Sequence, residues 1–307
     1  MARHKTRVTI GMPVFNGERH LRQALDSILD QTYQDFELII SDNASTDRTQ
    51  QICFEYEKKD DRITYHRIER NLGAAWNFNH VFKLSSSPYF KWAAHDDVVA
   101  PEFLSKCVNL LEQDETVVLC HSKTGRINDF GKVEGEYDCG KVTNSPQPQK
   151  RLSDVLIRKG FPWSIFGVFR SDALRRTHLI ENYIGADWNF LAEINLVGKT
   201  AEIPEYLFFR RQHPESFTDK FYPCLVHNYQ KEMLWWTGTK RMSLVTILPR
   251  WRSILGFFLS SHRIPRKQSE RWSCYEEITR WIVGEGWEFM MWDLASELKF
   301  WRINLNR

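Results

Sequence analysis

Apolar residues in the first third of the chain recur with two different periods, which alternate along the sequence. Val8, Ile10 and Met12 alternate with small or polar residues, as in a β-strand, and Pro13 ends the run. The other strand-like runs cover residues 36–40, 63–68 and 89–92, and helical spacing appears at 21–29, 71–82 and 101–111. Strands and helices that alternate through short connections predict an α/β fold with a mostly parallel, twisted, Rossmann-like sheet flanked by helices.

The middle of the chain departs from this alternation. Ser122–Arg151 is polar, contains scattered Gly and Pro and has little periodicity, so we expect a long loop that is either structural or a lid over a bound acceptor. Leu152–Lys159 has the spacing of a short helix. Trp163–Arg170 and Ala201–Phe209 have the composition of strands.

The last part of the chain has a different composition. Residues 225–307 contain eight of the twelve tryptophans, and Lys and Arg outnumber Asp and Glu there by 13 to 8. Helical spacing recurs among Trp287, Met290, Met291, Leu294, Leu298 and Trp301, and a second apolar stretch, Ile254, Leu255, Phe257 and Phe258, follows Arg250-Trp251-Arg252. We therefore expect a main domain over residues 1–217 and a helical, Trp-rich C-terminal extension over 218–307.

Two roles for this extension stay open. Trp and Arg beside an apolar helix face are typical of peripheral contact with an anionic membrane surface, where a lipid-linked acceptor would lie. The alternative, which the heptad-like spacing of the tryptophans favours, is a helical cap that packs on the main domain or on a second copy in a homodimer.

Composition narrows the class of protein. The chain has 307 residues, 42% apolar and 26% charged, as in ordinary globular proteins. A net charge of +3 excludes nucleic-acid binding driven by bulk charge. The six cysteines lack CxxC or metal-ligand spacing, which indicates free thiols in a reducing compartment. No apolar run approaches the ~20 residues of a membrane span and no targeting segment opens the chain, so we expect a cytoplasmic protein, either free or peripheral on the inner face of the membrane.

Polar residues follow several of the predicted strands directly. Asp42 follows the second strand, Asn71 the third, and the triplet His95, Asp96 and Asp97 the fourth. In parallel α/β sheets ligands bind beyond these carboxyl ends. Adjacent carboxylates repel each other, and a hard divalent cation is one remedy, although an isolated Asp-Asp pair is also ordinary turn chemistry. With Pro13–Phe15 at the end of the first strand, four strand ends carry polar or aromatic groups, which predicts a ligand site at one edge of the sheet.

Two residues of this edge also have purely structural interpretations. Phe15 can stack on a nucleotide base or pack within its loop, and Asp42 can accept a hydrogen bond from a base or cap the next helix. A nicotinamide enzyme would carry G-x-G-x-x-G after its first strand. This chain has GMPVFNG at residues 11–17, which lacks that phosphate cradle.

The order of these motifs resembles a known family. The segments that carry the resemblance are PVFNGERHL, ILDQTY, FELIISDNASTD, NLG and HDD, within residues 7–217. In this combination they are similar to the inverting family-2 glycosyltransferases of GT-A fold. The resemblance implies a nucleoside-diphosphate sugar donor held across the strand ends, with a divalent cation, Mn²⁺ or Mg²⁺, as cofactor.

The resemblance also implies roles for individual residues. Asp42 would bind the base, Pro13 and Phe15 would flank it, and Glu18 would lie near the nucleoside. Asn71 and Asn79 match the N-x-G…N pattern along the donor pocket. Asp97 would be a metal ligand, and Asp96 would lie near the ribose or diphosphate. Two positions depart from the pattern: His95 stands where an acidic residue is common, and Phe78 where many members have arginine.

The resemblance assigns the catalytic base to Asp187. From the residues alone, Asp187 lies at the start of a predicted helix that continues through Leu191, Ile194 and Val197, and a plain first-turn acid would also fit there. An inverting transfer needs a carboxylate that takes the proton of the attacking hydroxyl. Asp187 matches this base in the family's G-x-D segment, although Ala186 replaces the glutamate that commonly precedes it.

Further contacts come from the region after this helix and from two tryptophans. The segment Arg211-Gln212-His213-Pro214-Glu215-Ser216 resembles one that closes over the diphosphate, with His213 as a third metal ligand and Arg211 as a phosphate contact. His213 can equally be a plain loop residue. Trp163 and Trp188 are candidates for stacking on the acceptor or donor sugar, and buried packing is the alternative for both.

The function that these expectations define is a metal-dependent, inverting sugar transfer to an acceptor hydroxyl. The acceptor would be a sugar, a lipid-linked molecule or a small molecule, in polysaccharide, glycolipid or cell-surface glycan synthesis. Two alternatives remain: a nucleotide-sugar-binding module without transfer activity, and a nucleotidyltransferase. The second predicts a Gly- and Lys/Arg-rich loop after the first strand, and PVFNGERHL lacks one.

Overall fold

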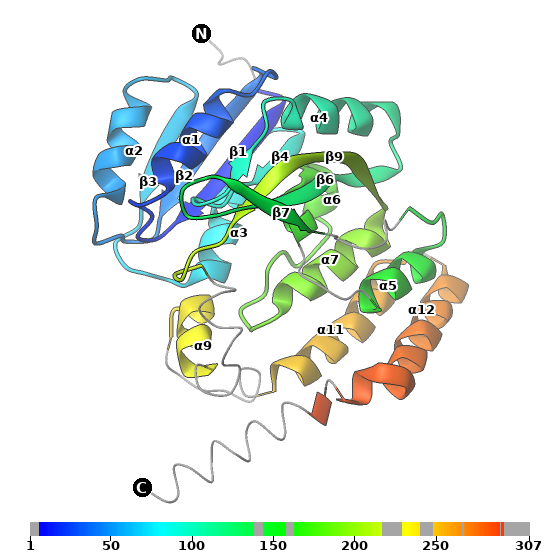
Figure 1. Ribbon diagram of the computed structural model, residues 1–307. Helices are drawn as coiled ribbons and strands as arrows, with labels where there is room; N and C mark the ends of the chain where they lie inside the picture. Colours follow the sequence, from blue (N-terminus) through cyan, green and yellow to red (C-terminus); the bar gives the residue numbers. More distant parts are fainter. Residues whose placement is uncertain are drawn as a thin grey trace, which may run out of the picture.

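The computed structural model describes residues 6–137, 144–157, 163–216, 229–239, 248–265, 267–288 and 290–291. Strands and helices alternate through the first half, and helices dominate the end of the chain (Figure 1). The elements are β1 (Val8–Val14), α1 (Leu21–Leu29), β2 (Phe36–Asp42), α2 (Thr49–Glu57), β3 (Ile63–Arg67), α3 (Ala74–Leu84), β4 (Tyr89–Trp92), β5 (Val98–Val99), α4 (Phe103–Gln113), β6 (Val117–Ile127), β7 (Val133–Tyr137), α5 (Pro148–Leu156), η1 (Trp163–Phe166), β8 (Val168–Arg170), α6 (Ser171–Leu174), α7 (Ala186–Val197), β9 (Lys199–Arg211), α9 (Tyr229–Thr237), α11 (Pro249–Arg263), α12 (Gln268–Trp281) and η3 (Ile282–Gly286).

Within the described residues, nine strands form one mixed sheet in the order β3-β2-β1-β4-β8-β6-β9-β5, with β7 paired to β6. The strands of the first half are parallel: β1 pairs with β2 and β4, and β2 pairs with β3. β8 is antiparallel to both β4 and β6, and β6 pairs in parallel with β9. The parallel block confirms the Rossmann-like arrangement that the alternating periods predict.

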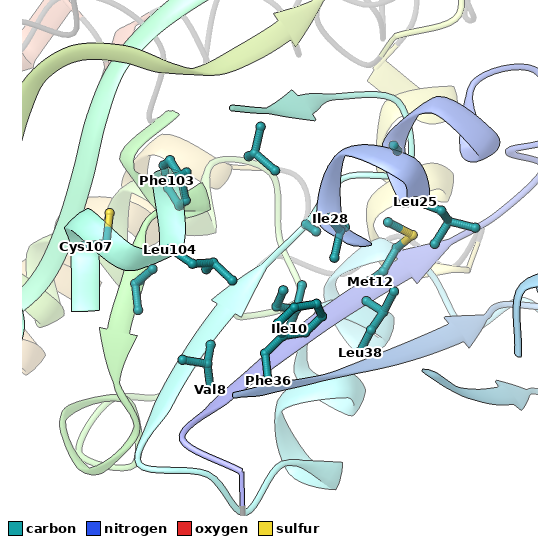
Figure 2. Close-up of a cluster of buried hydrophobic side chains, with 14 of the residues drawn as sticks. Val8, Ile10, Met12, Leu25, Ile28, Phe36, Leu38, Phe103, Leu104 and Cys107 are labelled. Carbon is teal, nitrogen blue, oxygen red and sulfur yellow. The ribbon is translucent and has the colours of Figure 1, made fainter. Parts of the chain in front are cut away.

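The strands of this block are covered on both faces, which explains their nearly continuous apolar sequence. Every residue of β1 is buried, and α1 packs Leu21, Ala24, Leu25 and Ile28 onto one side of the sheet. Figure 2 shows Leu25 and Ile28 of α1 in one apolar cluster with side chains of β1, β2 and α4. A second cluster, centred on Trp92, fills the opposite side between the sheet and α3 and α7.

The structure corrects two expectations about the middle of the chain. Much of Ser122–Arg151 is β-structure: β6 continues to Ile127 and turns through a hairpin into β7, while residues 138–143 lie outside the described part. β7 exposes most of its side chains at the edge of the sheet, so its polar sequence has no strand-like alternation. Trp163–Phe166 is a 3₁₀-helix, and only Val168–Arg170 is a strand.

The helices of the C-terminal part pack on the sheet domain. α9 packs on α3, α11 packs on α7, and α12 packs on α5. Leu152, Val155, Leu196, Phe257 and Ile278 share one buried cluster across these helices. The predicted periodic helix at the end of the chain lies largely outside the described residues, from Leu294 onward. None of the helices in the described part is long and apolar enough to cross a bilayer.

Candidate active site

The strand ends that carry the predicted chemistry lie at one edge of the sheet. β1, β2 and β4 are parallel neighbours, with Val14 opposite Asp42 and Gly11 opposite Trp92. Parallel neighbours direct their carboxyl ends the same way. Pro13 is buried within β1, and Phe15, just past its end, is 38% exposed. The ring of Phe15 therefore remains accessible at this edge.

The turn after β1 is fastened to the loop after β2 by reciprocal hydrogen bonds. The backbone N–H groups of Asn16, Gly17 and Glu18 donate to the side chains of Ser45, Thr49 and Asp47, respectively. In return, the Asn16 and Glu18 side chains accept hydrogen bonds from the backbone N–H groups of Thr46 and Arg48. Glu18 thus satisfies an otherwise free N–H at the start of α2, where a negative charge is also stabilised.

Asp42 is buried and fully engaged. Its carboxylate accepts hydrogen bonds from the Ser45 backbone N–H at 2.8 Å, the Tyr65 hydroxyl at 2.6 Å and the Arg67 guanidinium at 2.7 Å. Burial and the hydrogen bond to Asp42 raise the pKa of Tyr65, so its phenol keeps its proton and remains a donor. Tyr65 and Arg67 were not singled out from the sequence. They are two residues apart on β3, on the strand next to Asp42.

A network of amides fixes the segment between β3 and α3. Asn43 bonds the backbone N–H of Leu72, the carbonyl of Gly73 and the side chain of Asn71. Asn71 in turn accepts the Gly73 N–H at 2.8 Å. Gly73 has φ +87°, a conformation that L side chains rarely adopt, so the turn requires glycine. The predicted donor-pocket residue Asn71 is thus held rigidly at the site edge.

Asn79 makes contacts of a different kind, and its place in the donor pocket stays a prediction. Its amide donates to the Ile180 carbonyl at 2.8 Å and accepts the Ile180 N–H at 3.1 Å, as a paired strand would. This pairing ties α3 to the loop that leads into α7. The amide that lies under the strand ends is Asn77, which bonds Ser41 on β2 and, at 3.4 Å, the Val14 carbonyl on β1. Its one signal in the sequence is an unusual polar residue on the apolar face of a helix.

The His95-Asp96-Asp97 segment follows β4 and is joined to the end of β9. The His213 Nε2 atom lies 3.0 Å from the Asp96 carboxylate, and Asp97 accepts the Arg211 backbone N–H at 2.8 Å. His95 lies against Gly17, where a Cβ would be 2.7 Å from its ring. The structure therefore brings the predicted metal ligands Asp97 and His213 to one place.

Arg211 is fully buried and already bonded. Its guanidinium donates to the carbonyls of Asp96, Asn128 and Asp129 and to the side chain of Gln23. These bonds join β9 to the turn of the β6–β7 hairpin and to α1. A direct contact between Arg211 and a diphosphate stays a prediction, and it would require some of these bonds to be exchanged.

The electrostatics of the two aspartates differ. Burial and the neighbouring Asp96 carboxylate raise the pKa of Asp97. Burial also acts to raise the pKa of Asp96, but His95 and His213 outweigh it and hold that pKa below its usual range. A nearby cation would lower the cost of ionising Asp97.

The residues of this segment fit a hard divalent cation. The buried His213 Nδ1 atom has no hydrogen-bond partner, and a proton on Nε2 that is donated to Asp96 leaves Nδ1 with a free lone pair. A carboxylate commonly orients metal-bound imidazoles in this way. Among the described residues no group of three His, Cys, Asp or Glu side chains is arranged to hold a metal by itself. A cation here would need further oxygen ligands, such as those of a diphosphate.

Asp187 lies in the first turn of α7, as predicted. Gly185 precedes it with φ +84°, and the Asp187 carboxylate accepts the Trp188 backbone N–H at 3.0 Å. Burial raises the pKa of Asp187 to about 6. The carboxylate is therefore largely ionised at neutral pH and holds a proton more tightly than an ordinary aspartate.

Aromatic packing connects the start of α7 to the end of β4. The Trp92 ring meets Phe190 edge to face at 5.4 Å, one turn of α7 beyond Asp187, and its indole N–H donates to the Phe78 carbonyl. Trp92 is three residues before His95, so its indole connects the start of α7 with the end of β4 that leads to His95. A common cavity lined by Asp42, Asp97 and Asp187 stays a prediction.

The two candidate stacking residues lie in packed surroundings. The Arg210 guanidinium lies over Trp163, 5.1 Å from the centre of the Trp163 ring, and Trp163 meets Tyr137 edge to face. Trp188 is partly buried against the cluster of α5, α7, α11 and α12. A role of either in sugar stacking stays a prediction.

A cavity of about 560 Å³ lined by Arg7, Ser86, Ser87, Pro88 and Arg175 lies at the opposite edge of the sheet.

Comparison with known proteins places these observations in a family. The model of glycosyl transferase family 2 matches residues 9–181. An uncharacterized glycosyltransferase of Haemophilus influenzae is 26% identical over 211 residues, which cover 67% of this chain and 65% of that protein. The chain thus spans less than two thirds of the length of this relative.

Solved structures agree in fold. The structure of Staphylococcus aureus TarS 1–349 in complex with UDP-GlcNAc has a TM-score of 0.63 at 13% identity and covers 91% of this chain and 73% of that one. The Pyrobaculum calidifontis mannosyltransferase PcManGT with GDP-Man and Mn²⁺ has a TM-score of 0.52 at 13% identity, covering 97% and 87%. The fold and the strand-end site define a GT-A type α/β protein. The chain belongs to glycosyl transferase family 2.

Proposed function

We propose that the protein is a metal-dependent, inverting glycosyltransferase that moves a sugar from a nucleoside-diphosphate sugar to an acceptor hydroxyl. The observation that carries this proposal is the attachment of the α7 start, with Asp187, to the end of β4, which leads into Asp96 and Asp97. A carboxylate suited to take a proton is thereby linked to a segment suited to bind a diphosphate and its cation.

The donor is assigned to the strand ends of the parallel block. The exposed Phe15 ring offers a base a stacking surface, and recognition of the base by the buried Asp42 would require some of its bonds to Tyr65 and Arg67 to be exchanged. Asn71 and Glu18 fix the two loops on either side. Uridine and guanosine diphosphate sugars are the first donors to test, because TarS and PcManGT were solved with UDP-GlcNAc and GDP-Man.

Asp97 and His213 are the residues that would hold Mn²⁺ or Mg²⁺, with Asp96 orienting the imidazole. When bound, such an ion stabilises the negative charge of the departing nucleoside diphosphate. His213 is buried and fastened to Asp96, which suits a residue that has to keep one orientation through the reaction.

Asp187 is assigned the role of general base. It accepts the proton of the acceptor hydroxyl as the oxygen attacks the anomeric carbon, and the nucleoside diphosphate leaves on the opposite side. The bond between acceptor oxygen and sugar forms while the bond to the diphosphate breaks, so the configuration inverts. This single displacement requires no covalent enzyme intermediate.

The test is a thermal-shift screen of nucleoside diphosphates and their sugars, with and without Mn²⁺, because ligands that bind the folded state raise its stability. We expect one diphosphate to raise the Tm with Mn²⁺, and we expect the rise to shrink markedly in Asp97→Ala or with chelator. Asp61→Ala, an exposed aspartate far from the strand ends, is the matched control. A full response in Asp97→Ala and with chelator would contradict the metal-dependent mechanism.

We further propose that the acceptor belongs to a polysaccharide, glycolipid or other cell-surface glycan, and that the protein meets it from the cytoplasm. Trp251, Leu255 and Leu259 form an exposed stripe on α11, a helix that contains Arg and no acidic residue. Such a stripe suits the anionic surface on which a lipid-linked acceptor lies. Flotation with anionic vesicles should capture the protein, and a Trp251→Ser, Leu255→Ser variant should remain behind. A concentration-dependent dimer without vesicle binding would favour the homodimer instead.

A further inference from the structure

Helix α11 of the C-terminal extension lies beside α7, whose first turn contains Asp187 (Figure 1). Two arginines join α11 to the sheet domain, Arg252 near the start of the helix and Arg263 at its end. Each is paired with a glutamate, Arg252 with Glu181 and Arg263 with Glu193. The two ion pairs have the same chemistry, but they hold different parts of the chain.

The Arg252 pair holds the loop that leads directly into α7. The guanidinium donates to the Glu181 carboxylate and lies over the Tyr183 ring, 5.2 Å from its centre. The Tyr183 carbonyl in turn accepts the Ala186 backbone N–H at 3.2 Å, one residue before Asp187. A single guanidinium therefore contacts two residues of the loop from which the chain turns into α7.

The first turns of α7 and α11 are also packed closely. The Asn189 amide donates to the Ser253 carbonyl at 2.9 Å, and a Cβ on Gly256 would be 2.1 Å from the Asn189 nitrogen. On α9, the Trp236 indole N–H donates to the Glu181 carbonyl at 3.2 Å. Two helices of the extension thus converge on the loop before α7.

We propose that Arg252 is a positioning residue for the transfer reaction: by holding Glu181 and Tyr183 it fixes the loop before α7, and with it the direction and the shielding of the Asp187 carboxylate. This inference rests on the proposed function, because it is the transfer reaction that uses Asp187 as a base. It gives α11, which lies beyond the residues matched by the family model, a part in the reaction.

The Arg263 pair offers a matched comparison, because it holds α7 far from its first turn. Arg263 donates to the Glu193 carboxylate and, at 2.6 Å, to the Arg176 carbonyl. Glu193 is 2% exposed, so removal of Arg263 leaves a buried carboxylate without its cation. Loss of Arg263 should therefore destabilise the protein at least as much as loss of Arg252. An effect on Asp187 that only Arg252 shows is then not a consequence of lower stability.

The titration of Asp187 reports how well its carboxylate is shielded. Burial is the main cause of its raised pKa, and the Trp188 backbone N–H acts against it. If the loop loosens, water reaches the carboxylate and its pKa falls toward that of an ordinary aspartate, about 4. Loss of the Arg252 charge alone would raise the pKa, so a fall identifies loosening. The titratable groups of the loop, α9 and α11 around this region are Glu181, Tyr183, Glu232, Arg250 and Arg252.

The first test is an NMR titration of ¹³C-labelled Asp carboxyl groups, which needs no substrate, with Asp187→Asn identifying the Asp187 signal. We expect a midpoint near pH 6 in the native protein and in Arg263→Met, and a clearly lower one in Arg252→Met. Glu181→Ala keeps the Arg252 charge but removes its partner, so it should lower the midpoint too. Arg252→Lys, which can still pair with Glu181, should restore most of the shift. An unchanged midpoint in Arg252→Met, or an equal fall in Arg263→Met, would overturn the positioning role.

The second test measures release of nucleoside diphosphate at pH 8 from UDP-GlcNAc or GDP-Man, whichever the thermal-shift screen selects. We expect kcat to fall about ten- to a hundredfold in Arg252→Met, because small displacements of a catalytic group are costly, while the Kd of the donor stays within about twofold. In Arg263→Met kcat should stay within about twofold of the native value, despite a lower Tm. A native kcat in Arg252→Met would overturn the proposal. A lowered Asp187 midpoint in Arg252→Met combined with full release by Asp187→Asn would keep the hold on Asp187 and overturn the base assignment of the proposed function.

Discussion

The donor side and the base side of the site are built by different means. On the donor side, between β1, β2 and β3, side chains and backbone groups exchange hydrogen bonds reciprocally, and Asp42 alone accepts three. On the base side, the partly buried Asp187 carboxylate at the start of α7 accepts the Trp188 backbone N–H, and burial raises its pKa to about 6. A saturated network fixes geometry for binding, whereas a carboxylate with a raised pKa is ready to take a proton.

The largest expected effect comes from the base side. Asp187→Asn keeps an oxygen that can accept the Trp188 N–H but cannot take a proton. We expect kcat to fall by about two to four powers of ten while the Kd of the donor stays within about twofold, since general-base catalysis contributes about that much. Single-turnover kinetics and calorimetry measure the two quantities. A matching loss of donor affinity would place Asp187 on the donor side instead.

Asp42→Ala tests the saturated network. It leaves Tyr65 and Arg67 without their shared acceptor, so we expect the free energy of unfolding to fall by about 3 kcal/mol and donor binding to be lost. Urea denaturation measures the stability. Tyr65→Phe removes one hydrogen bond only and should cost about 1 kcal/mol. Equal stability of Asp42→Ala and the native protein would show that the network is not stabilising.

Gly73→Ala tests the close contact between the turn before α3 and the end of α9. Alanine is strained at φ +87°, and its Cβ would collide with the Gly238 backbone. We expect a loss of about 2 kcal/mol in unfolding free energy and weaker donor binding. The matched control is Gly284→Ala, where a Cβ meets nothing within 4 Å. A Gly73→Ala protein as stable as this control would contradict the close contact between Gly73 and Gly238.

The acid limb of the pH profile gives the smallest effect. The pKa of Asp187 is raised above its unfolded value, and the base works only when ionised. kcat should therefore fall about tenfold per pH unit below about pH 6 and recover above it. Stopped assays between pH 4.5 and pH 8 measure this limb. A midpoint near pH 4 would mean that Asp187 is not shielded from water.

The sequence predicts the parallel block and its site edge well, because period-two runs and polar strand ends are local signals. The α7 start at Asp187 is also a local signal, and the structure has it where predicted. The β6–β7 hairpin was missed because an exposed edge strand carries polar residues on both faces. Nothing in β3 marks Tyr65 and Arg67 as partners of Asp42, because that pairing depends on the register of β2 and β3.

The packing of α9 illustrates a second limit of sequence reasoning. α9 is polar and aromatic on several sides, so its spacing does not show which face is buried. The buried face is decided by the contacts of Trp236 with the loop before α7 and of Gly238 with Gly73. Both contacts join segments far apart in the chain. Long-range packing therefore determines which face of α9 is buried.

The hydrogen bonds of Arg211 have a mechanical consequence. One guanidinium links the carbonyl of Asp96 to the hairpin turn at Asn128 and Asp129, and His20 lies 3.0 Å from the Asp129 carboxylate. The hairpin turn is thereby tied to the His95-Asp96-Asp97 segment. A molecule that lifts the turn has to release Arg211 first, so hairpin opening and loosening of this segment would occur as a single event.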